Sequence, residues 1–290
     1  PPPWREWNDR FRDDVRDLWR GEAGWDTGSA RITGSADLFR RDGRDASSSV
    51  NAVATHDGFT LADLVSYDQP VEGGHGQRSW NGGLEGPTSD PTVAAERMRR
   101  QRAMLATVLC AQGVPMILSG DELGRSQGGR SDGYTLDPAE WGLPWPDADW
   151  DLVAWTAAAV ELRRAHPVLA RSAWVDPDHP AVVWRTPAGE EMTEADWSDD
   201  TRRGIRIDLD GDGDGARPDR LVVLALTGPS DPDSTEEFTL PAGAWRIVLD
   251  ASWVRPPVPA DRAVVSGSVP LAAPGFCVLA PAGDEVPAET

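Results

Sequence analysis

Acidic residues follow two short apolar runs in the first half of the chain. His56-Asp57 comes directly after Val50–Thr55, and Asp121 comes two residues after Val114–Ser119. In parallel β/α architectures the carboxyl ends of the strands face the functional site, so acids at these positions are candidates for catalysis or substrate binding. Asp is also a preferred N-cap residue, and each acid could instead cap the helix that follows it. Both interpretations stay open at this point.

Tryptophan is the second unusual feature, because it supplies 14 of the aromatic residues against 2 Tyr and 5 Phe. Trp7 and Trp80 lie in polar surroundings, and each is followed by an asparagine, Asn8 and Asn81. An indole can pack on the apolar face of a sugar ring while a neighbouring amide bonds its hydroxyls. These four residues are therefore candidate sugar contacts, and packing within the core is the alternative for each tryptophan.

The charge composition excludes several functions. The chain has 290 residues, 28 basic and 48 acidic, and a formal net charge of -20, and every basic residue is Arg. Without Lys there is no P-loop phosphate site, no Schiff-base chemistry and no pyridoxal phosphate enzyme. An acidic surface repels polyanions, so we expect no nucleic acid and no membrane as partner.

Cysteine and histidine usage points to neither a disulfide framework nor a metal centre. Cys110 and Cys277 form no Cys-x-x-Cys pair and are expected to be buried thiols in a reducing compartment. No apolar run reaches the length of a membrane helix and no signal peptide opens the chain, so a cytoplasmic location is expected. The four histidines are scattered, so we expect no metal. The Asp208–Asp219 segment imitates a calcium loop but lacks the bidentate Glu, which favours a solvated β-connection over calcium binding.

The chain divides into two parts by pattern. Residues 1–165 alternate helical periodicity with short apolar runs, which implies β/α units with parallel strands. Residues 166–290 contain short apolar runs separated by Gly, Pro and Asp, which is typical of an antiparallel β-sandwich. The runs expected to be strands are Ala181–Arg185, Gly204–Leu209, Leu221–Thr227, Glu236–Leu240, Trp245–Leu249, Ala263–Val265 and Phe276–Leu279.

Five segments of the first part together resemble a known family. They are Glu6–Gly21 (EWNDRFRDDVRDLWRG), Thr33–Phe39 (TGSADLF), Asn51–Tyr67 (NAVATHDGFTLADLVSY), Ser79–Thr88 (SWNGGLEGPT) and Gln112–Gly129 (QGVPMILSGDELGRSQGG). This combination is similar to the isoamylase-type glycogen debranching enzymes of the α-amylase superfamily. The stretch Val183–Trp197 resembles the start of that family's carboxy-terminal β domain.

The resemblance implies a fold and a reaction. Residues 1–165 would supply strands six to eight of a TIM-type β/α barrel, and residues 166–290 the β-sandwich that follows it. The family hydrolyses α-1,6 branch linkages of glycogen or limit dextrin with retention, and no cofactor is implied. Of its three catalytic carboxylates only the third maps to this chain, as Asp57, and His56 would bind hydroxyls of the sugar at the cleaved bond.

The nucleophile and the general acid are expected in polypeptide upstream of Pro1. The missing amino-terminal part of the same polypeptide is thus an expected partner, and residues 1–290 alone are expected to hydrolyse no glucan. Two alternatives stay open. One is an α-1,4-glucan hydrolase or transglycosylase of the same superfamily, and the other is a non-catalytic module that binds glucan through its Trp-rich loops.

Overall fold

A computed structural model describes residues 4–73, 76–135, 137, 142–174, 181–211, 219–228 and 234–283. Within these residues no helix is both long and apolar enough to cross a membrane. The Asp208–Asp219 segment lies partly outside the described residues, so the calcium alternative stays untested there.

Three short strands form a parallel sheet in the order β1-β2-β3. They are β1 (Glu6–Trp7), β2 (Ser49–Asn51) and β3 (Val114–Pro115). Trp7 lies opposite Val50, which in turn lies opposite Val114. Because the three strands are parallel, their carboxyl ends meet at one edge, and the loops that follow them are brought together there.

Helices connect and cover these strands. The first, α1 (Asp9–Arg20), begins at the N-cap Asn8 and ends at Gly21, whose φ of 79° is a left-handed conformation that glycine adopts without strain. The longest, α5 (Pro91–Cys110), begins at Asp90, which accepts two backbone N–H bonds. The other α-helices of the described residues are α2 (Trp25–Ile32), α3 (Ala36–Phe39), α4 (Leu61–Leu64), α7 (Trp150–Ala165) and α8 (Glu194–Trp197). The short 3₁₀ turns are η1 (Arg40–Asp42), η2 (Ala46–Ser48), η3 (Asp121–Leu123), η4 (Gly133–Thr135), η5 (Trp145–Asp147), η6 (Pro167–Ala170) and η7 (Pro259–Asp261).

The second part of the chain forms two antiparallel sheets. One has the order β4-β5-β6-β11-β8-β9 and the other pairs β10 with β7. The strands are β4 (Val182–Arg185), β5 (Gly204–Gly211), β6 (Asp219–Leu226), β7 (Thr235–Thr239), β8 (Trp245–Asp250), β9 (Val264–Val265), β10 (Ser268–Ala272) and β11 (Gly275–Pro281). Every run that sequence analysis expects to be a strand in this part overlaps one of them, which confirms the antiparallel prediction.

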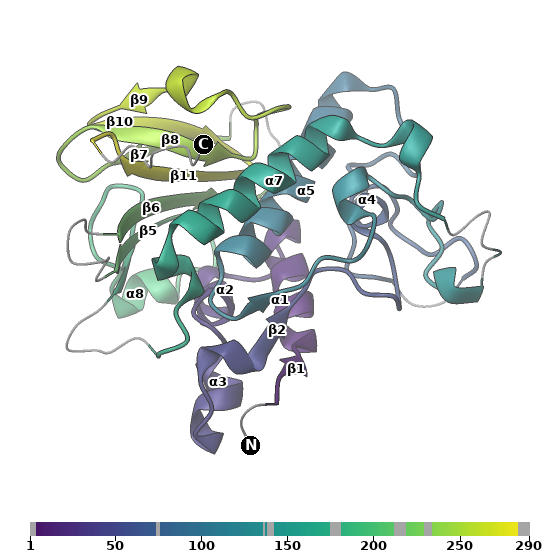
Figure 1. The fold of residues 1–290 in the computed structure, drawn as a ribbon, viewed down its shortest axis with the longest axis horizontal. Coiled ribbons are helices and arrows are strands. Elements are labelled where there is room, and N and C mark those ends of the chain that lie inside the picture. The colour runs from purple at the N-terminus through teal and green to yellow at the C-terminus, as the bar shows by residue number, and fades with distance from the viewer. Residues whose placement is uncertain are drawn as a thin grey trace.

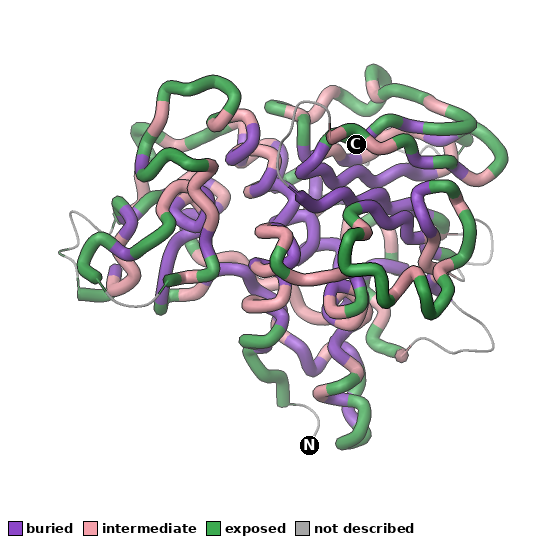
Figure 2. The backbone as a smooth tube through the Cα atoms, turned by 180° about the vertical axis from the view of Figure 1, so that it is seen from behind, coloured by how far each residue is buried: buried purple, intermediate pink, exposed green. Residues whose placement is uncertain are grey.

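Two apolar cores lie on opposite faces of the larger sheet. Alternate residues of β6 and β11, such as Val223 and Phe276, pack against α1, α5 and α7, and Figure 1 shows these helices beside the sheet. The residues between them, such as Leu224 and Cys277, pack against β7 and β10. Figure 2 shows the resulting band of buried residues through the strands and into the helical part. The central strands β6 and β11 of the larger sheet are therefore buried on both faces.

The strand after α5 differs from its sequence prediction. The apolar run Val114–Ser119 is expected to be a strand, but only Val114–Pro115 is strand, and the run is half-buried up to an exposed Ser119. The physical reason is that β3 pairs with β2 alone among the described strands, so one edge and much of its surface face solvent.

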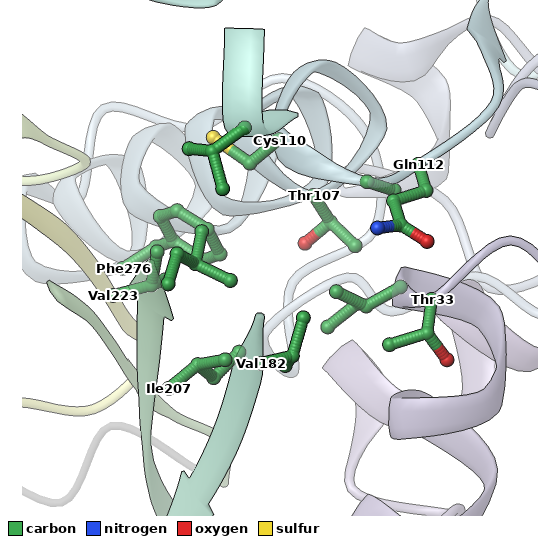
Figure 3. Close-up of a pocket in the computed structure, with 12 residues that line it drawn as sticks. Thr33, Thr107, Cys110, Gln112, Val182, Ile207, Val223 and Phe276 are labelled. Atoms are coloured by element: carbon green, nitrogen blue, oxygen red, sulfur yellow. The ribbon is translucent and has the colours of Figure 1, made fainter. Parts of the chain in front are cut away.

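A small cavity lies between α5 and the larger sheet (Figure 3). It has a volume of about 20 Å³ and is lined by Thr107, Cys110, Val223 and Phe276, among others. This volume is about that of a single water molecule, so the cavity can hold no sugar ring. Burial raises the pKa of the Cys110 thiol in its wall to about 12, which leaves the thiol unreactive.

Candidate functional site

His56 and Asp57 lie in the loop that leaves the carboxyl end of β2, and both side chains face solvent. The side chain of His56 is 55% exposed and that of Asp57 is 69% exposed, and His56 Nε2 lies 3.3 Å from Asp57 Oδ2. Trp7, at the carboxyl end of the neighbouring β1, places its indole edge-on to the His56 ring with 5.8 Å between centroids. The structure thus brings together three of the predicted site residues from two adjacent strands.

Trp7 also borders a surface hollow of about 270 Å³. Its lining includes Asp9, Arg10, Asp42 and Arg44. Because most of these side chains are exposed and charged, the hollow is polar, and the Trp7 indole is an apolar surface at its margin. Such a combination of an aromatic face with convergent polar groups is typical of sites that bind small polar molecules.

The His56-Asp57 loop is anchored on both sides. The Gly58 N–H donates to the carbonyl of Ser131 over 2.8 Å, and Phe59 is fully buried and packs on Tyr67. Gly58 has a φ of +109°, and a Cβ there would lie 2.5 Å from Gln77 Oε1. The positive φ favours glycine at position 58, whereas the Gln77 side chain could move away from a Cβ.

Two buried carboxylates hold this loop against the loop that follows β3. Asp121 Oδ1 accepts the N–H of Leu61, the first residue of α4, over 3.0 Å. In return, Asp63 of α4 accepts the hydroxyl of Ser126 over 2.5 Å and the N–H of Gln127 over 2.8 Å. We call this pair, Asp63 and Asp121, the carboxylate clamp. Within the described residues Asp121 caps no helix that follows it; its carboxylate instead adds an acceptor at the amino end of α4, whose N-cap is Thr60.

Burial controls the protonation of the carboxylate clamp. Desolvation raises the pKa of Asp121 to about 7, against the opposing effects of the Leu61 N–H and the Arg125 charge. The pKa of Asp63 is also raised by burial, although its hydrogen bonds act in the opposite direction. Nearby Arg16 donates to the carbonyls of Val53 and Gln77, and desolvation lowers its pKa to about 9. The base of the site is therefore a buried polar network.

Asn8 has a structural role. Its side chain is the N-cap acceptor for the Phe11 N–H at 2.9 Å, and its amide nitrogen donates to the hydroxyls of Ser35 and Ser49. The residue is 5% exposed. These bonds hold α1 and the segment before α3 to β2, and they leave no group of the Asn8 side chain facing solvent beside Trp7.

Trp80 and Asn81 lie in a separate loop. The Trp80 ring stacks on the guanidinium of the buried Arg100, 3.9 Å from its centroid. Asn81 donates to Glu85 over 2.5 Å and accepts the N–H of Gly83 over 2.7 Å. No hydrogen bond or ring contact within the described part of the chain joins either residue to His56 or Asp57.

Asp63 and Arg16, which support the site from below, are not among the candidate residues predicted from the sequence. The signal for Asp63 is its position three residues after Thr60, which caps α4 by accepting the Asp63 N–H. Arg16 falls among the apolar residues of one face of α1, where an arginine is unexpected unless its guanidinium finds acceptors. Within the described residues no cluster of His, Cys, Asp and Glu could hold a metal ion.

The exposed groups suit a ligand rich in hydroxyls. Asp57 offers an acceptor, His56 a donor or an acceptor, and Trp7 an apolar face.

Two curated proteins are similar in sequence to most of this chain. The chain is 40% identical over 281 residues to the glycogen operon protein GlgX homolog of Mycobacterium tuberculosis (strain ATCC 25618 / H37Rv), covering 87% of this chain and 39% of that protein. It is 37% identical over 258 residues to the glycogen debranching enzyme of Dickeya chrysanthemi, covering 85% of this chain and 37% of that protein.

The chain is a homologue of the glycogen debranching enzymes. This finding confirms the family resemblance stated from the sequence motifs. The chain spans about two fifths of the length of the curated relatives that it matches. No family model matches it.

Solved structures support the same relationship at the level of the fold. A pullulanase type I from Bacillus subtilis str. 168 complexed with maltose superposes with a TM-score of 0.69 at 22% identity, over 96% of this chain and 35% of that one. A pullulanase from Anoxybacillus sp. LM18-11 complexed with maltotetraose gives a TM-score of 0.67 at 20% identity, again over 96% and 35%. The fold of this chain therefore matches that of about a third of each of these pullulanase structures.

Proposed function

We propose that this chain is the carboxy-terminal part of a glycoside hydrolase that cleaves α-1,6 branch linkages of glycogen-derived glucans. In this proposal residues 1–165 contribute β1, β2 and β3 as strands six, seven and eight of a β/α barrel, and residues 166–290 form the β domain. The observation that carries the proposal is the exposed His56-Asp57 pair at the carboxyl end of β2, with Trp7 against it. The homology to glycogen debranching enzymes supports the substrate class.

Asp57 would stabilise the transition state rather than attack the substrate. Cleavage of a glycosidic bond passes through an oxocarbenium-like state, and hydrogen bonds to ring hydroxyls that tighten in that state lower the barrier by several kcal/mol. The Asp57 carboxylate is exposed and can accept such bonds. His56 would bind a second hydroxyl of the same sugar, and the Trp7 indole would pack on the apolar face of that ring or of its neighbour.

Retaining hydrolysis needs two further carboxylates about 5 Å apart, a nucleophile and a general acid. We propose that polypeptide outside these 290 residues supplies both, since the chain spans about two fifths of the length of its relatives. The two buried free cysteines support a cytoplasmic setting. Because Asn8, Trp80 and Asn81 are engaged in local structure, the sugar contacts proposed here are Asp57, His56 and Trp7.

Hydrolysis assays on two proteins test this function. Purified residues 1–290 should release no reducing sugar from glycogen or limit dextrin. A protein extended by the upstream coding sequence should release linear chains from both. Release of branched oligosaccharides, with turnover of unbranched amylose, would instead identify an α-1,4-glucan enzyme. Hydrolysis by residues 1–290 alone would refute the proposal that the nucleophile and the general acid lie outside these residues.

A further inference from the structure

Two tryptophans on the surface lie side by side, far along the sequence from His56 and Asp57. Trp145 begins η5 and Trp150 begins α7, and they are 57% and 55% exposed. Their ring centroids are 6.5 Å apart and the ring planes differ by 33°. Large aromatic side chains this exposed lose the free energy of burial, so a pair of them on a surface marks a candidate binding site.

The backbone beneath the two indoles is rigid. Asp149 caps α7 by accepting the N–H groups of Asp151 and Leu152, and its own N–H donates to the carbonyl of Leu123 over 3.0 Å. The N–H of Asp147 closes the η5 turn by donating to the carbonyl of Pro144. The two tryptophans therefore extend from a fixed turn, so a ligand that stacks on them orders little backbone.

The chemistry around the pair favours a neutral ligand rich in hydroxyls. Within the described residues neither indole N–H of the pair has a hydrogen-bond partner, so both remain available as donors. The surrounding side chains include the exposed Asp147 and the half-buried Asp151, and the latter is paired with Arg255 at 2.9 Å. Carboxylates accept bonds from hydroxyls, whereas they and the net charge of -20 oppose nucleic acid and anionic lipid.

We propose that Trp145 and Trp150 form a second glucan-binding platform, on which two successive sugar rings of an α-glucan chain stack. This inference rests on the proposed function for the class of ligand. Two indole planes at a shallow angle match a chain that curves from one ring to the next, and each indole can hold the apolar face of one ring. The platform would retain a long glucan beside the site without contacting the bond that is cleaved.

The fold places the platform near the loops of the candidate site. Asp149 is bonded to Leu123, and Leu123 belongs to η3, the same turn that contains Asp121 of the carboxylate clamp. In Figure 1 the amino-terminal end of α7 lies at the upper right, beside the loops around α4. A chain bound at the platform is thus kept on the side of the molecule that carries these loops.

Binding of maltoheptaose and of soluble glycogen to residues 1–290, measured by calorimetry and by affinity electrophoresis, tests the platform. The double variant Trp145→Ala/Trp150→Ala should bind both at least about tenfold more weakly, since two aromatic stacking contacts are removed. Trp145→Phe/Trp150→Phe should recover part of the affinity. The matched control is Trp4→Ala, which removes a tryptophan that is 73% exposed and stacks on no other ring of the described residues, and it should leave binding unchanged.

Three results would overturn the platform: no binding by the wild-type chain, unchanged affinity in the double variant, or a double variant altered only in self-association. The last would make the pair an interface between protein chains. None of these results contradicts the proposed function, because that function is tested by the hydrolysis assay on the extended protein. Conversely, the extended protein could bind glucan at the platform and hydrolyse none. That result would refute the proposed function, keep the platform, and identify the protein as a non-catalytic glucan-binding module.

Discussion

Asp57 and Asp121 follow neighbouring strands, yet their environments are opposite. Asp57 is exposed beside His56, whereas Asp121 is 1% exposed beneath α4. An exposed carboxylate stays charged and can accept bonds from a ligand, while a buried one serves better as a structural acceptor. We therefore propose ligand binding for Asp57 alone, whereas Asp121 is a structural acceptor for the N–H of Leu61.

The raised pKa of Asp121 makes stability depend on pH. The folded chain keeps this proton up to about pH 7, whereas the unfolded chain loses it near the ordinary value of 3.8. Between these values the folded state binds more protons, so the free energy of unfolding falls as the pH rises. The free energy of unfolding should therefore differ between pH 5 and pH 8, and we expect Asp121→Asn to reduce that difference by about 2 kcal/mol, measured by urea denaturation at the two pH values. The exposed Asp26→Asn should leave that difference unchanged, and an equally steep profile in Asp121→Asn would contradict the assignment.

The position of Asp57 was predictable from sequence, and its support was not. An apolar run followed by His-Asp places the pair at a strand end, because parallel strands end at a common edge. The bond between Asp121 and Leu61 joins residues 60 positions apart, and no local pattern encodes it. Likewise the indole of Trp80 stacks on Arg100, a partner that only the fold supplies.

At the scale of elements, short strands are held in place by the helix ends beside them. Asn8 caps α1 and also bonds Ser35 and Ser49, so a single side chain connects a helix, the segment before α3 and β2. We expect Asn8→Ala to cost about 2 kcal/mol of unfolding free energy in urea, because a cap is lost and two buried hydroxyls lose a donor. Thr193→Ala removes the capping box of the exposed α8 and should cost about half as much. Equal losses would show that Asn8 acts only as a cap.

The strands of the second part follow their sequence pattern, with one exception that has a physical reason. β10 (Ser268–Ala272) was not predicted, because Pro270 lies in its middle and proline cannot donate to a sheet. The strand pairs only with β7 among the described strands, and Pro270 faces solvent. Edge strands tolerate a proline in this way, and sequence alone does not distinguish an edge strand from a loop.

At the scale of the whole molecule, the two parts of the chain share a core. Trp19 of α1 packs on Phe276 of β11, with 6.4 Å between ring centroids. The indole of Trp25 donates to the carbonyl of Arg203, and that of Trp155 donates to the carbonyl of Asp250. The boundary that sequence patterns suggest therefore separates two kinds of secondary structure, while one apolar cluster runs through both.

The shared core predicts a single unfolding transition. Trp155 is fully buried, and Trp155→Phe removes one of the two donors to the Asp250 carbonyl and leaves part of the indole volume unfilled. We expect a loss of about 2 to 3 kcal/mol, with near-UV and far-UV circular dichroism still changing together. Trp150→Phe, on the exposed face of the same helix, should change stability little. Separate transitions for the two signals would contradict a common core.

The central claim is that Asp57 acts on the glucan in the transition state. Its most direct test is the turnover number of Asp57→Asn on limit dextrin, in the protein extended by its upstream coding sequence. We predict a fall of at least about a hundredfold with an unchanged melting temperature, since the lost interaction contributes several kcal/mol in the transition state and the side chain is exposed in the fold. Asp26→Asn should keep full turnover. Undiminished turnover in Asp57→Asn would contradict the account.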